Sequence, residues 1–331
     1  MKPAGGGHPP SPPQRRRFPW LSWLGFAGAC LVPLLGLNAY HVEVLTSAGI
    51  FVLLALGLNL VVGFTGLLHL GYAAFFAIGA YTYGLLNLHW HVPFWGGLVP
   101  SAVVAGLCGV ALGIPVMRVR GDYLAIVTLG FGEIVRLTFT NLEQWTGGPN
   151  GLLGIAHPVG WLPGRGWYDF GVDSLPYYYL VAAAVALVAT ACWRLADSRI
   201  GRAWMAIRED ELAASCAGIP AVHLKLLAQG CGAAIAGVAG AIFAAKQGTI
   251  TPDSFDFILS VMLLAMVVFG GLGSIVGVMV GALILGALPE VMRGLDQYRM
   301  LLFGVVMILM VRWRPQGLLG GPQIRRELTR G

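Results

Sequence analysis

The chain of 331 residues consists mainly of apolar stretches, many of them long enough to cross a lipid bilayer. About 20 apolar residues in helical conformation span the hydrocarbon core of roughly 30 Å. Only 11% of the residues are charged, whereas soluble domains carry about 25%. Such a chain cannot build a water-facing surface, so we predict an all-α, polytopic transmembrane helical bundle.

About ten segments fit a membrane span by length and composition. They are 18–38, 44–62, 67–88, 94–116, 122–140, 177–195, 224–245, 257–270, 274–290 and 300–313. The segments 257–270 and 274–290 are short and joined only by Gly271-Leu272-Gly273. The sequence leaves open whether these two cross the membrane fully or re-enter from one side.

The positions of the basic residues predict how the bundle is oriented. With an even number of spans and both termini in the cytoplasm, most of the 21 Lys and Arg residues fall in cytoplasmic segments. This is the distribution that the positive-inside rule describes. Because the net charge of +6 lies in these membrane-flanking segments, we expect contact with the lipid bilayer and no nucleic-acid binding.

The segments outside the spans divide the chain into parts. Residues 1–17, rich in Pro and Gly, are predicted to be a disordered cytoplasmic tail, and 316–331 a second cytoplasmic tail. A secretory signal at 15–38 is the alternative for the first span, but this apolar run continues too far for one. Between the tails, the bundle of 18–315 has a long outer loop, 141–176, and a long cytoplasmic loop, 196–223.

The cytoplasmic loop has features of a short amphipathic helix. Residues 203–217 combine charged and small side chains, and Gly218 and Pro220 follow as helix-ending residues. A helix of this kind on the membrane surface is either a solvated part of the loop with no partner or a contact site for a soluble protein.

The sequence holds no set of residues that indicates an enzyme. It lacks the H-E-x-x-H, G-x-S-x-G and phosphate-loop motifs. The five cysteines show no C-x-x-C spacing, so we expect neither a metal site nor a cofactor on this chain.

Glu133 and Arg136 are the most prominent charges inside a predicted span. They are three residues apart and therefore share a helix face. An unpaired charge at this depth would cost about 2.5–3.5 kcal/mol, so the two residues are expected to pair or to face a polar cavity. We favour a structural ion pair or a partner contact, and a contact with a zwitterionic substrate on the transport path is the alternative.

Glycines indicate close helix packing and interrupted helices. Gly109 and Gly113, like Gly277 and Gly281, have the G-x-x-x-G spacing that lets helices approach closely. Two similar runs, Leu53-Leu54-Ala55 and Leu263-Leu264-Ala265, each precede a glycine-rich break, formed by Gly63 and Gly66 in the first case and by Gly271 and Gly273 in the second. An internal duplication would explain this echo, but two short matches in a Leu- and Gly-rich chain leave the question open.

Four stretches carry a resemblance to a known family. They are 56–66 with 71–81, the run 118–136 that contains Gly-Asp-Tyr-Leu-Ala-Ile-Val-Thr-Leu-Gly-Phe-Gly-Glu-Ile-Val-Arg, the outer Thr-Gly-Gly-Pro-Asn-Gly of 146–151, and 201–219 with Gly-Arg-Ala-Trp-Met-Ala-Ile-Arg-Glu-Asp-Glu. These stretches resemble the LivM-type permease subunits of ATP-binding-cassette importers for branched-chain amino acids. The resemblance covers roughly residues 40–320.

The resemblance implies a set of partners and a location. They are a second, LivH-like permease subunit, two cytoplasmic ATPases that bind ATP and Mg, and an external substrate-binding protein, assembled at a bacterial inner membrane. Residues 203–218 would be the coupling helix that transmits ATPase movement. Its coupling residues would be Arg208, Glu209, Glu211, Ala213, Ala214 and Gly218. The E-A-A–x3–G signature of importer permeases is interrupted here by Leu212, which leaves the docking contacts open.

Other functions stay open at this point. Permeases for urea, amides or other amino acids share the architecture, so Leu, Ile and Val are the preferred but not the only expected substrates. An ion-coupled secondary transporter would need an intramembrane carboxylate, for which Glu133 is the candidate. A polytopic membrane enzyme is disfavoured by the missing motifs. The sequence does not decide whether two permease subunits form a heterodimer or a homodimer.

Overall fold

A computed structural model of the chain describes residues 38–117, 119, 122–162, 166–171 and 173–291, with 304, 305, 308, 312–314 and 317–319. The predicted first span, 18–38, lies outside the described residues except for its last residue, and so does most of the predicted last span, 300–313. The predicted N-terminal tail and most of the C-terminal tail also lie outside them.

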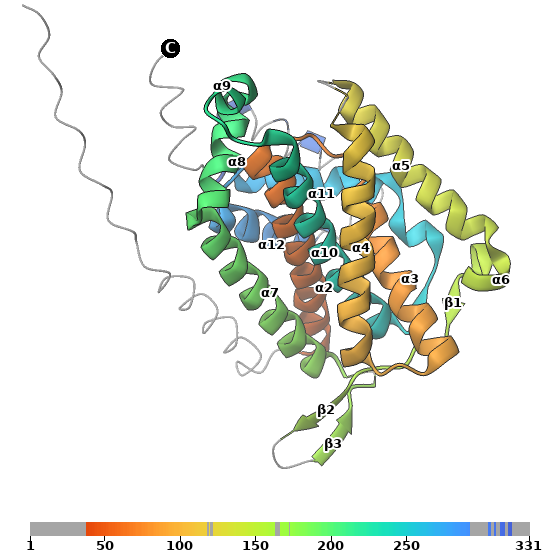
Figure 1. Ribbon diagram of the computed structural model, residues 1–331. Coiled ribbons are helices and arrows are strands. Elements are labelled where there is room, and N and C mark those ends of the chain that lie inside the picture. Colours follow the sequence, from red (N-terminus) through yellow and green to blue (C-terminus); the bar gives the residue numbers. More distant parts are fainter. Residues whose placement is uncertain are drawn as a thin grey trace, which may run out of the picture.

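The described chain is a bundle of α-helices with a few short strands (Figure 1). In chain order the helices are α2 (Ala39–Leu58), the π-helix η2 (Asn59–Phe64), α3 (Ala73–Trp90), α4 (Phe94–Val116), α5 (Asp122–Asn141), α6 (Glu143–Thr146), η3 (Gly148–Asn150), α7 (Ser174–Asp197), α8 (Arg199–Glu209), α9 (Glu211–Cys216), α10 (Ala221–Gln247), η4 (Pro252–Phe255), α11 (Phe257–Gly270) and α12 (Ile275–Val291). Long apolar helices are expected here because a bilayer leaves no water to satisfy backbone groups.

Six helical stretches in the described part of the chain are long and apolar enough to cross a membrane. They are Ala39–Phe64, Phe94–Val116, Tyr123–Asn141, Ser174–Asp197, Ala221–Gln247 and Pro252–Gly270, and the apolar helix Ile275–Leu288 is shorter. The predicted all-α, multi-pass architecture is therefore confirmed for these residues. The count of about ten spans and the cytoplasmic position of both termini remain predictions.

Helix α10 lies in the middle of the bundle and packs against α2, α3 and α4 (Figure 1). The contacts are close because glycine faces glycine or alanine. A side chain at Gly79 of α3 would collide with the backbone of Gly237 on α10, and a Cβ at Gly109 of α4 would lie 2.5 Å from the Cβ of Ala233. Backbones approach in this way only where side chains are small.

Helices α8 and α9 cover one end of the bundle, and a β-hairpin extends from the other end (Figure 1). The hairpin pairs β2 (Val159–Leu162) with β3 (Gly166–Asp169), and β1 (Leu152–Leu153) pairs with β4 (Thr249–Ile250), both antiparallel. We call the α8–α9 end inner and the hairpin end outer, after the predicted orientation.

The sequence does not indicate either of the two strand pairs. Strands of two to four residues are too short to show the alternation that indicates a strand. The β1–β4 pair also joins segments almost 100 residues apart in the sequence, and local patterns carry no signal for such pairing.

Candidate functional site

The segment predicted to lie in the cytoplasm is two helices, α8 and α9, and not the single helix expected over 203–218. Asp210 has an extended backbone, with φ −155° and ψ 109°, between α8 and α9. Its carboxylate accepts hydrogen bonds from the backbone N–H groups of Leu212 at 2.8 Å and Ala213 at 2.9 Å. An Asp side chain that caps a helix in this way starts a new helix rather than continuing the previous one. The prediction of one continuous helix over 203–218 is therefore wrong, and the coupling role of its residues stays a prediction.

Helix α8 is fixed to the membrane bundle by Trp204. The indole ring is fully buried, and its Nε1–H donates a hydrogen bond of 2.7 Å to the carbonyl of Leu224 at the start of α10. Gly201 and Ile207 are buried on the same face of α8. Since these residues recur at helical spacing, one face of α8 packs on the bundle and the opposite face remains open.

Helix α9 is fixed by an ion pair that the sequence did not indicate. The Nζ of Lys225 on α10 lies 2.7 Å from Glu211 Oε2, and the Lys225 side chain is only 10% exposed. Helix α9 ends at Cys216, and two residues later Gly218 has a φ of +82°, the left-handed conformation that favours glycine. Glu211, predicted as a coupling residue, is thus held within the chain.

The predicted coupling residues divide into two groups by exposure. Glu209, Ala213 and Gly218 are exposed at the tip of the segment, Ala214 is buried, and Arg208 is half-buried. Leu212, which interrupts the expected signature, is 76% exposed. The tip therefore presents the carboxylate of Glu209 together with the large apolar side chain of Leu212.

Arg208 points away from this tip towards the first predicted helix break. Its Nη1 donates a hydrogen bond of 2.5 Å to the carbonyl of Gly63 in the π-helix η2. Its Cγ lies 3.3 Å from the place that a Cβ at Gly66 would occupy. Gly66 has a φ of +74°, so a side chain there would also strain the backbone.

The two predicted helix breaks, at Gly63 and Gly273, lie against each other next to Arg208. The backbone N–H of Gly273, in the second break, donates a hydrogen bond of 2.9 Å to Asn59 Oδ1 in η2. A Cβ at Gly273 would lie 3.2 Å from both Arg208 Nη1 and the Gly63 carbonyl oxygen. We call this set, formed by Asn59, Gly63, Gly66, Arg208 and Gly273, the inner joint.

A third segment reaches the second break. The backbone N–H of Leu318 donates to the Phe269 carbonyl at 2.9 Å, and that of Leu319 to the Gly270 carbonyl at 3.3 Å. Carbonyls in the last turn of a helix lack partners within it, and Leu318 and Leu319 supply the donors at the end of α11. Gly271 and Gly273 both have positive φ values, 111° and 80°.

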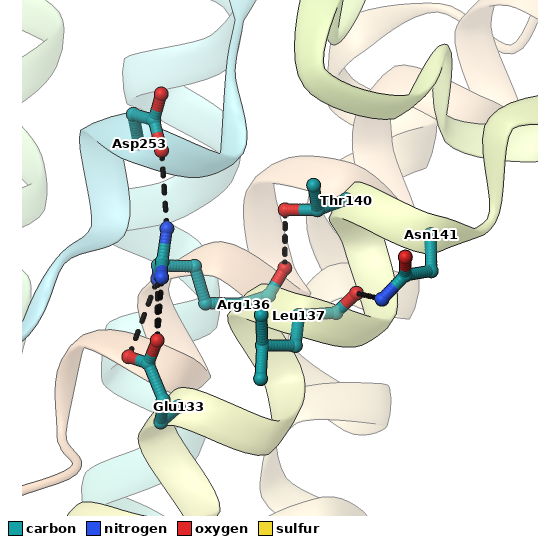
Figure 2. Close-up of polar contacts among 6 residues, drawn as sticks. All are labelled: Glu133, Arg136, Leu137, Thr140, Asn141 and Asp253. Atoms are coloured by element: carbon teal, nitrogen blue, oxygen red, sulfur yellow. Dashed lines mark hydrogen bonds and ion pairs between the residues drawn. The ribbon is translucent and has the colours of Figure 1, made fainter.

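Glu133 and Arg136 form a second charged site, towards the outer end of α5 (Figure 2). Arg136 Nη2 lies 2.5 Å from Glu133 Oε1, and Nη1 lies 3.1 Å from Oδ1 of Asp253 in η4. The side chains of Arg136, Glu133 and Asp253 are 27%, 41% and 82% exposed. The structure therefore brings the predicted pair together and adds a carboxylate from a segment 117 residues away. We call these three residues the outer cluster.

The predicted packing glycines lie at two helix contacts. On α4, a Cβ at Gly113 would lie 2.5 Å from Leu226 of α10, which continues the contact made by Gly109. On α12, a side chain at Gly277 would collide with the Gly270 carbonyl, and a Cβ at Gly281 would lie 2.7 Å from Gly270 Cα. Helices α11 and α12 thus form a tight antiparallel hairpin.

Sequence reasoning missed Asn59, Trp204, Lys225 and Asp253 as site residues. Asn59 did carry a signal, because it is a polar side chain within an otherwise apolar predicted span. The other three act through partners on other helices, and a single sequence does not show such contacts. In the described part of the chain, no group of three or more His, Cys, Asp or Glu residues is placed to hold a metal ion.

Comparison with known proteins gives one consistent result. The family profile described as "Branched-chain amino acid transport system / permease component" matches residues 40–311. No solved structure gave a significant match to the chain.

Individual proteins that are similar to this chain are permease proteins of branched-chain amino acid transport systems. The chain is 45% identical over 306 residues to the high-affinity branched-chain amino acid transport system permease protein LivM of Salmonella typhimurium, covering 87% of this chain and 71% of the relative. It is 44% identical over 304 residues to LivM of Escherichia coli K12, with the same coverage of both proteins. It is also 24% identical over 294 residues to the permease protein LivH of the same E. coli strain, covering 85% of this chain and 94% of LivH. The chain therefore belongs to the family of permease components of branched-chain amino acid transport systems.

Proposed function

We propose that this chain is one membrane-spanning permease subunit of an ATP-binding-cassette importer that carries leucine, isoleucine and valine across a bacterial inner membrane. The observation that carries the proposal is the similarity to LivM proteins over most of the chain. The multi-pass helical bundle and the folded segment on its inner end agree with a transport subunit driven from outside the chain.

A second permease subunit is expected beside this one. In E. coli K12 both LivM and LivH are similar to this chain, so one organism contains two homologous permeases whose names belong to the same system. Helix α5 is the least buried of the six candidate spans, with 17% of its apolar window buried, and it also has the lowest mean hydropathy. A helix with this composition suits contact with a protein partner or a polar path better than contact with lipid.

Two cytoplasmic ATPases would bind at the tip of the α8–α9 segment. The tip offers the exposed carboxylate of Glu209 and the exposed side chain of Leu212, a mixture typical of a protein contact. ATP and Mg would be bound by the ATPases, and the external binding protein would deliver the amino acid at the outer end. No observation favours an ion-coupled carrier, since Glu133 is already paired with Arg136.

The first experiment is purification of the tagged chain from its native membrane in mild detergent, followed by mass spectrometry of what remains bound. Recovery of a second permease and of ATPases with phosphate-binding loops is expected. Vesicles with this complex and the binding protein should then take up leucine only when ATP is present. A chain that purifies alone, and transports alone, would overturn the proposal. Competition of leucine uptake by urea or amides would indicate the alternative substrate class.

A further inference from the structure

We propose that Arg208 is a positioning residue that connects the α8–α9 segment to both helix breaks, so that a movement of α8 reaches the two breaks together. The inference rests on the proposed function, because it gives Arg208 a role within ATP-driven transport. It also separates Arg208 from the residues that would touch the ATPases.

The direction of the side chain is the first argument. Arg208 is half-buried, although its neighbours Glu209 and Asp210 are exposed at the tip. Its guanidinium donates to the Gly63 carbonyl within the bundle. A residue whose main role was to grip a soluble partner would place its charged group at the exposed tip, as Glu209 does.

The partner atom is the second argument. The π-helix η2 ends at Phe64, so carbonyls in its last turn lack partners further along the helix. Arg208 supplies the missing donor to Gly63, through a charge-assisted hydrogen bond of 2.5 Å. Loss of this bond would leave a carbonyl without its partner in a closely packed part of the bundle.

The contact between the two breaks is the third argument. A Cβ at Gly63 would lie 2.7 Å from the backbone nitrogen of Gly273, and Asn59 accepts a hydrogen bond from the same nitrogen. The backbones of the two breaks lie close together and the Asn59 side chain bridges them, so displacement of one requires displacement of the other. Closely packed parts of this kind change between discrete arrangements rather than deforming gradually.

This arrangement predicts that Arg208 affects how transport is coupled to ATP, and not whether the ATPases bind. The test uses the complex purified from its native membrane and reconstituted in vesicles with the binding protein. Leucine uptake and ATP hydrolysis are measured in the same vesicles, and the result is uptake per ATP hydrolysed. The variants are Arg208→Gln and Arg208→Lys, of which the second keeps the charge but lacks the planar, multiply donating group.

Arg202 provides the matched control. It lies on the same helix and is exposed, and its side chain donates a hydrogen bond to the Asp197 carbonyl near the surface. We expect uptake per ATP to fall about tenfold or more in Arg208→Gln, since a hydrogen bond to a charged group is lost. The decrease should be smaller in Arg208→Lys, and Arg202→Gln should match the wild type.

Two results would overturn the inference. One is an unchanged uptake per ATP in both Arg208 variants. The other is loss of the ATPases from complexes carrying Arg208→Lys, which would make Arg208 a docking residue. If Arg208→Gln does not yield folded protein, Arg208→Lys alone decides between these results. Failure of the proposed function is recognised separately, because the wild-type complex would then show no ATP-driven uptake.

Discussion

The inner joint and the outer cluster each contain one arginine within reach of a membrane helix, and the two are held differently. Arg208 donates to a backbone carbonyl where two helix breaks touch. Arg136 is bound by two carboxylates, and one of them, Asp253, is 82% exposed. At the inner joint the arginine connects pieces of backbone, whereas at the outer cluster it neutralises side chains.

This difference indicates where the chain is sensitive to change. A bond to backbone in a closely packed contact has no substitute nearby, so its loss leaves an unsatisfied group. An exposed ion pair can be replaced by water and is usually worth about 1 kcal/mol or less. We therefore expect substitutions at the inner end to have larger effects than chemically similar substitutions at the outer end.

The largest contrast is expected between two tryptophans. Trp204 at the inner end is fully buried, whereas Trp95 at the outer end is 53% exposed, although its indole N–H also donates to a carbonyl, that of Val159. Trp204→Ala should lower the free energy of unfolding by about 3–5 kcal/mol, and Trp95→Ala by clearly less. The loss of stability in each variant is followed as the fraction of protein that stays monodisperse after heating in detergent, compared with the wild type. Equal losses would contradict the proposed contrast between the ends.

A second contrast compares two glycines. An added methyl at Gly63 would collide with Asn59 Oδ1 and press on Gly273, whereas nothing lies within 4 Å of a Cβ at Gly130 on α5. Gly63→Ala should therefore destabilise the protein by about 1–3 kcal/mol. Gly130→Ala should leave its thermal stability unchanged or raise it, since alanine favours a helix by up to about 1 kcal/mol. A stable Gly63→Ala protein would show that the inner joint is looser than the structure indicates.

A smaller effect is expected from Glu133→Gln in the outer cluster. Arg136 keeps its contact with Asp253, so the loss should be about 1 kcal/mol or less. Leucine uptake by the reconstituted complex should remain ATP-driven and insensitive to a collapsed proton gradient. If the wild type instead depends on the gradient and the variant does not, the carrier is ion-coupled and Glu133 is its relay.

The last prediction concerns accessibility and involves no loss of stability. Cys216 is exposed at the end of α9, and Cys192 is buried in α7. A membrane-impermeant maleimide should label Cys216 from the cytoplasmic side only, and bound ATPases should slow this labelling. Labelling from the outer side would invert the predicted orientation, and labelling that the ATPases do not slow would remove α9 from the docking surface.

The sequence predicted the apolar helices well because their signal is local. The expected spans 94–116 and 257–270 coincide with α4 and α11. The glycine pairs around Gly63 and Gly271 also lie where the helices are interrupted. Each of these features is decided by residues close together in the chain.

The parts that the sequence missed depend on contacts between distant segments. The bond from Gly273 to Asn59 joins residues 214 positions apart, and Asp253 reaches Arg136 from beyond α10. The division of the cytoplasmic helix failed for another reason. Asp210 is a residue type that caps helices but also occurs inside them, and only the structure shows that it begins α9.

The close glycine contacts of α10 restrict how this protein can vary. At Gly79 and Gly237, and at Gly109 beside Ala233, the smallest possible side chain already meets another backbone or methyl group. Even the smallest substitution, glycine to alanine, exceeds the space at these positions, so no substitution is small enough to be tolerated without a shift of the helices. Inherited change would then accumulate at positions exposed on α4 and α5, such as Val103 and Ile134.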